Sequence, residues 1–238
     1  MVPDEEANGG DDPSPDARAV DDAAAADDAH AATDAPTVDD ALRAGIVLYE
    51  RGYYHAAHDP WEAAWLPRDG ADANLLQGLI QLTAAVHHAR DHNWSGATGV
   101  ATSGYEYLAA VPDDHAPVDL GPARRYLARL AVDPEHAERR DPPPLPYEGG
   151  AVGVDGLGFD ALALAVGAVA EETNLDESVV ADAIRYAREE QGSGQARFRG
   201  LLADLVAEDP ERRAVAYARL ESHVERERSK ERDVDGLF

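Results

Sequence analysis

The chain has no cysteine, a single lysine, a single methionine and no long apolar run among its 238 residues. The absence of cysteine excludes disulfide bonds, thiolate metal sites and cysteine nucleophiles. No run of 18 apolar residues is present to cross a membrane as a helix, and the N-terminus lacks the basic and apolar regions of a signal peptide. We therefore expect a soluble, cytoplasmic protein without a membrane partner.

Basic residues are scarce as well, and nearly all of them are arginine. The chain has 47 acidic and 21 basic residues and a net charge of −26, and its only lysine is Lys230. The basic residues form no patch along the sequence, so nucleic acid is not an expected ligand. A surplus of aspartate with little lysine is typical of halophilic cytoplasmic proteins, because molar salt screens the repulsion between carboxylates. We interpret the charge as an adaptation to habitat.

The order of the chain predicts an all-α protein. Residues 1–36 hold eleven acids and almost no large apolar side chain, which indicates a disordered acidic tail. Apolar periodicity then predicts helices at about residues 38–51, 54–66, 72–92, 94–111, 122–132, 159–172, 177–191, 195–207 and 210–233. Short connections favour an up-and-down helical bundle at residues 37–140. A Pro- and Gly-rich linker at 141–153 would separate it from a helical C-terminal domain at 154–238.

The most distinctive stretch is residues 73–89, which contain no charged side chain. In so acidic a protein, an uncharged helix is predicted to be central and buried. At 100° per residue, Gln77, Gln81 and His88 fall within about 60° of arc and form a polar stripe on this helix. An unpaired buried polar group costs roughly 1–3 kcal/mol, so the stripe is expected to have partners.

The nearest partners lie on the preceding helix, where His58 and Glu62 are four residues apart and share a face. One interpretation is a hydrogen-bonded network with Gln77, Gln81 and His88 that fixes the packing of the bundle. A second is a divalent-metal or hydrolytic site, since two imidazoles and a carboxylate (His58, Glu62 and His88) suffice for either. A third is a small polar ligand held between the two helices.

The sequence favours the first interpretation, a structural or interaction module. Buried polar groups are usually paired for structural reasons, and Glu62 also fits a capping box that begins at Asp59. The chain contains no phosphate-binding loop, no G-x-S-x-G and no H-E-x-x-H motif. No enzyme class is therefore indicated, and self-association or a protein partner stays open.

Three ordered motifs carry a resemblance to a known family. They are G-x-Y-x-x-A-H-x-x-W-E-x-x-W at residues 52–65, Q-G-L-I-Q at 77–81 and H-x-x-x-x-N-x-x-G-A at 88–97. Over residues 38–132 the chain resembles the domain of unknown function 309 family, in a haloarchaeal version. The resemblance implies a small all-helical bundle and brings no activity with it.

The resemblance also implies a set of polar positions. Carried onto this chain, they are His58, Glu62, Gln77, Gln81, His88 and Asn93. The sequence departs from the family pattern at Ala56, where a glutamate is common. It departs again at Asp59 and Pro60, which replace a glutamate and an aliphatic residue.

Overall fold

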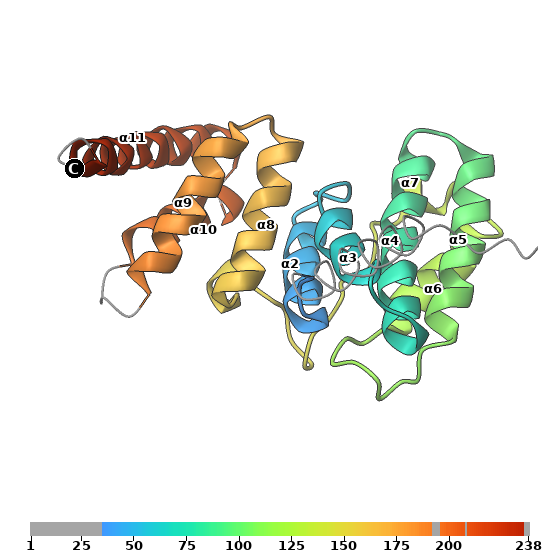
Figure 1. Cartoon of the computed structure of the whole chain (residues 1–238). Coiled ribbons are helices and arrows are strands. Elements are labelled where there is room, and N and C mark those ends of the chain that lie inside the picture. The colour runs from blue at the N-terminus through green and yellow to red at the C-terminus, as the bar shows by residue number, and fades with distance from the viewer. Residues whose placement is uncertain (1–34, 192–195, 208, 236–238) are drawn as a thin grey trace, which may run out of the picture. The chain divides into compact units, whose positions relative to one another are not determined.

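The computed structural model of the chain describes residues 35–191, 196–207 and 209–235 (Figure 1). Its first helices are α2 (Val38–Glu50), α3 (His58–Trp65), α4 (Gly70–Arg90), α5 (Trp94–Ala109), α6 (Gly121–Leu130) and α7 (His136–Arg139). A 3-10 helix, η1 (Val154–Gly156), precedes α8 (Phe159–Glu172), α9 (Glu177–Glu190), α10 (Arg197–Ala207) and α11 (Pro210–Asp235). These described residues contain isolated β-bridges but no named strand. The predicted all-α class is confirmed.

The helix boundaries follow the sequence signals closely. Thr37, Asn93 and Asp176 each accept a backbone N–H from their own first turn, at 3.1, 3.1 and 2.9 Å. Such N-caps stabilise a helix by about 1 kcal/mol. The periodicity did not predict α7 or η1, because four and three residues are too short to show a repeat. The predicted tail lies outside the described residues apart from its last two positions.

Two glycines let α4 and α5 approach each other closely. A Cβ atom at Gly78 would lie 2.3 Å from Leu108, and one at Gly104 would lie 2.9 Å from Cβ of Gln81. Neither distance is compatible with a side chain at the glycine, so the two backbones are in direct contact. The uncharged stretch at residues 73–89 lies within α4, and its apolar side chains are buried, as predicted: Leu75, Leu79, Leu82 and Val86.

Residues 36–238 form one compact unit, and the predicted linker at 141–153 packs against its helices. The Tyr49 hydroxyl of α2 donates to the carbonyl oxygen of Pro143 at 2.8 Å, and Glu50 accepts the backbone N–H of Leu145 at 2.7 Å. Leu145 is buried, and α2 also contacts α8. The division into two helical domains stays a prediction, because these contacts do not decide it.

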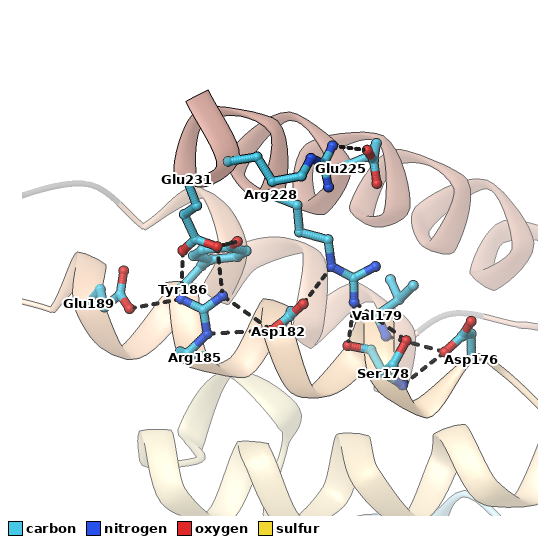
Figure 2. Close-up of polar contacts among 11 residues, drawn as sticks. Asp176, Ser178, Val179, Asp182, Arg185, Tyr186, Glu189, Glu225, Arg228 and Glu231 are labelled. Atoms are coloured by element: carbon cyan, nitrogen blue, oxygen red, sulfur yellow. Dashed lines mark hydrogen bonds and ion pairs between the residues drawn. The ribbon is translucent and has the colours of Figure 1, made fainter. Parts of the chain in front are cut away.

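Ion pairs join α9 to the second half of α11 (Figure 2). Arg185 donates to Glu231 at 2.8 Å, and the hydroxyl of Tyr186 donates to the same carboxylate at 2.8 Å. Arg228 reaches back from α11 to Asp182 at 2.5 Å. These charges are partly exposed, so each pair contributes about 0–1 kcal/mol, and the set specifies orientation more than stability.

In the part of the chain that the structure describes, no helix is long and apolar enough to cross a membrane.

The fit between α2 and α3 depends on a glycine. The indole of Trp61 is fully buried, and a Cβ atom at Gly45 would lie 2.2 Å from its Nε1. This Nε1 has no hydrogen-bond partner in the described structure, which costs about 1–3 kcal/mol. Burial of the large ring offsets that cost, because an aromatic side chain removes about 150–250 Å² from water.

We predict that Gly45→Ala lowers the free energy of unfolding by about 1–3 kcal/mol, because the added methyl group displaces the Trp61 ring. Gly99→Ala in α5 is the matched control, since no atom lies within 4 Å of that Cβ position. It should stabilise the helix by about 0.5–1 kcal/mol. Chemical denaturation of both variants measures the difference, and equal stabilities would refute the packing argument.

Candidate functional site

The site is built around the first turn of α3, for which the sequence leaves two starts open: a helix from Tyr54 that kinks at Pro60, or a regular helix from Asp59 with Pro60 at its first position. Residues 54–57 form turns, and α3 starts at His58 instead of Tyr54. Pro60 is the third residue of the helix, where the backbone N–H would have no partner inside the helix. The proline therefore causes no kink, and it fixes the start of α3 near His58.

His58 joins α3 to α4 through a main-chain oxygen. Its Nε2 lies 2.9 Å from the carbonyl oxygen of Ile80, so Nε2–H donates and the neutral ring suffices for the bond. Burial lowers the pKa of His58 below its usual range, and nearby His55 lowers it further, although the bond to Ile80 and the charge of Glu62 oppose this. The ring is therefore neutral at neutral pH.

A group of carboxylates adjoins His58 where α3 contacts α8. Burial, followed by the negative charge of Glu171, raises the pKa of Asp59 to about 6. His55 Nδ1 lies 3.2 Å from Glu172, and its ring centroid is 6.2 Å from that of His58. The sequence did not predict this group of Asp59, Glu171 and Glu172. Glu171 and Glu172 lie more than 100 positions from Asp59, and such a separation leaves no periodic signal.

The predicted pair of glutamines lies at the edge of the core. Gln77 and Gln81 are half-buried, and neither makes a side-chain hydrogen bond within the described residues. The Cβ atom of Gln81 faces Gly104 of α5, not α3. The stripe therefore faces α5 at Gln81, and neither glutamine is hydrogen-bonded to His58.

His88 and Asn93 are brought together at the junction of α4 and α5. The side-chain amide of Asn93 lies 3.2 Å from His88 Nδ1, and its oxygen accepts the backbone N–H of Gly96 at 3.1 Å. This arrangement is a helix cap with a histidine attached. Glu62 is exposed and meets neither histidine at hydrogen-bond distance.

None of the six predicted residues is fully buried: His58, Gln77, Gln81 and His88 are half-buried, and Glu62 and Asn93 are exposed. In residues 35–191, 196–207 and 209–235, no group of three or more histidine, aspartate or glutamate side chains is arranged to hold a metal ion. The metal site at His58, Glu62 and His88 stays a prediction.

A buried arginine, which the sequence did not predict, contacts the start of residues 53–58 at Tyr53. Arg213 of α11 is 4% exposed, and its Nε donates to the carbonyl oxygen of Leu205 at 2.7 Å. It also donates to the hydroxyl of Tyr53 and lies 5.1 Å from the centre of that ring. Residues 53–58, which we call the junction segment, thus contact α4, α8 and α11.

We predict that Asp59→Asn raises the free energy of unfolding by about 1 kcal/mol at pH 7.5. This is less than the full pKa shift would give, because solvent screens the charge of a half-buried side chain. A carboxyl group whose pKa rises on folding stabilises the fold below its unfolded pKa, and this contribution is lost as pH rises through about 6. The gain should therefore shrink below pH 6 and vanish near pH 4. Asp114→Asn removes the same charge from an exposed loop, and the idea fails if both variants behave alike.

Comparison with known proteins adds one match. No curated protein matches the chain. A family model described as "Domain of unknown function (DUF309)" matches residues 42–100, a shorter range than the predicted 38–132. The matched range runs from α2 into α5 and includes the junction segment and all six predicted polar residues. Residues 42–100 of the chain are therefore a DUF309 domain.

Proposed function

We propose that the protein is a non-enzymatic helical module, structural or protein-binding, in which the junction segment holds neighbouring helices together. The observation that carries the proposal is the bond from His58 Nε2 to the carbonyl oxygen of Ile80 at 2.9 Å. The bond engages Nε2 in joining α3 to α4, so of the two ring nitrogens only Nδ1 is left to bind a metal or to accept a proton.

Two further contacts of the junction segment support this role. His55 pairs with Glu172 at the end of α8, and Tyr53 accepts from the buried Arg213 of α11. Each contact joins the DUF309 domain to a helix outside the matched range. The polar side chains therefore connect parts of the fold, as a structural interpretation requires.

We predict that His58→Ala lowers the free energy of unfolding by about 1–3 kcal/mol, because burial and a hydrogen bond are lost. His58→Gln keeps an N–H donor and should lose less. His87→Ala is the control, since His87 is exposed and its ion pair with Asp91 lies on the surface, and it should change stability by less than about 0.5 kcal/mol. A His58→Ala variant as stable as the control would remove the structural role.

One observation favours the alternative, a divalent-metal-binding or hydrolytic site at His58, Glu62 and His88. Burial lowers the pKa of His58 and raises that of neighbouring Asp59 to about 6. A carboxyl group with a raised pKa beside an imidazole with a lowered one is a pair of the kind that acid–base catalysis uses.

Elemental analysis of protein purified without chelator or affinity tag separates the two functions. The structural module predicts no stoichiometric metal and no stabilisation by added Zn²⁺ or Mn²⁺. One bound metal per chain that is lost in both His58→Ala and His88→Ala would establish the alternative. His87→Ala again serves as the control, because it adjoins His88 but lies outside the predicted ligand set.

We also infer that the acidic composition suits a high-salt cytoplasm and that the partners are proteins or further copies of the chain. The net charge of −26 supports this, since it repels nucleic acid and anionic membranes.

A further inference from the structure

The helix α11 differs in charge from the rest of the chain. It carries seven basic and seven acidic residues, whereas the other parts of the chain share 14 basic and 40 acidic residues. Its inward-facing cations have partners: Arg228 pairs with Asp182 of α9 (Figure 2), and Arg213 is buried against Leu205 and Tyr53.

The outward-facing cations form a row. Arg212, Arg219 and Arg226 are seven residues apart, which places them along one side of the helix. Arg219 is exposed and has no ion-pair, hydrogen-bond or ring partner among the described residues. Arg226 donates to Nδ1 of His223 at 2.7 Å instead of to a carboxylate. Neither Arg219 nor Arg226 is paired with a carboxylate among the described residues, so their charges are available to a partner.

Two adjoining hollows lie beside this row. The larger, about 500 Å³, is lined by Ala214, Val215, Ala218, Arg219, Ser222, His223 and Arg226. The smaller, about 240 Å³, shares Val215 and Arg219 with it and reaches Asp204 of α10. Val215 is 54% exposed, and its neighbours Ala218 and Ser222 are small. The face thus offers a shallow apolar groove with positive charge along one edge, which we call the α11 groove.

We propose that the α11 groove docks an acidic amphipathic helix of a protein partner. Small apolar side chains of that helix would cover Val215 and Ala218, and carboxylates seven residues apart would pair with Arg219 and Arg226. The proposal deepens the proposed function, on which it rests, by naming the surface and the class of partner. Charge complementarity selects the partner, because the arginines of this face attract carboxylates and repel a basic helix.

Binding of a synthetic peptide to the full-length protein tests the proposal. The probe is a fluorescein-labelled, alanine-rich 22-residue peptide with glutamates seven residues apart, and the control peptide has glutamine at those positions. Fluorescence anisotropy is measured at low salt, because salt screens charge pairs at a groove edge. It should show binding of the acidic peptide and at least about tenfold weaker binding of the glutamine peptide, which has no carboxylates to pair with the arginines.

Protein variants locate the site. Arg219→Glu and Arg226→Glu should each weaken binding of the acidic peptide by about tenfold. Arg129→Glu makes the same charge change on the exposed side of α6 and should leave binding unchanged. Circular dichroism checks that each variant folds. Val215→Gln, which keeps all charges, should weaken binding of the peptide through the apolar part of the groove.

Four results would overturn the proposal. The first is no binding by the wild-type protein, and the second is equal binding by Arg219→Glu and Arg129→Glu. The third is displacement of the peptide by a 20-base-pair DNA duplex whose own binding depends on Arg219. The fourth is a dimer in sedimentation analysis that dissociates in Val215→Gln, which would assign the groove to a second copy. None of these results changes the stability expected of His58→Ala, so the proposed function and the docking site fail separately.

Discussion

The indole ring of Trp61 lies against the bare backbone of Gly45, and the position of α3 depends on this contact. Because the ring fills the space that a side chain at residue 45 would take, α2 and α3 have one close arrangement. The first turn of α3 is then held in place, and His58 reaches the carbonyl oxygen of Ile80 on α4. The polar contact of His58 therefore depends on the packing of Trp61 against Gly45, which sets the position of α3.

Arginine side chains make several of the polar contacts to main-chain oxygens in this chain. Arg51 donates to the carbonyl oxygen of Ala207, Arg124 to that of Leu108 and Arg213 to that of Leu205. A guanidinium group can satisfy several acceptors at once, which a single ammonium group does less well. Arg219 differs from these arginines, because it is exposed and lines the α11 groove.

Sequence reasoning predicted the local structure well and the partners of side chains poorly. The range of α8 was predicted without error, because helical periodicity and the residues that end a helix are local features of the sequence. The partner of His58 is a main-chain oxygen, which no residue type can signal. The stripe on α4 was also recognised, but periodicity fixes a direction around the helix axis and not the neighbour in that direction. Gln81 consequently faces Gly104 of α5.

The two titratable groups at the start of α3 respond to pH in opposite directions. Folding lowers the pKa of His58, so its contribution to stability is present above pH 6.5 and is lost as pH falls. Folding raises the pKa of Asp59 to about 6, so its contribution is present at low pH and is lost as pH rises through 6. Adjacent positions thus compensate each other across the same range of pH. A pH switch would need the two shifts to act together, whereas a joint between helices benefits from their opposition.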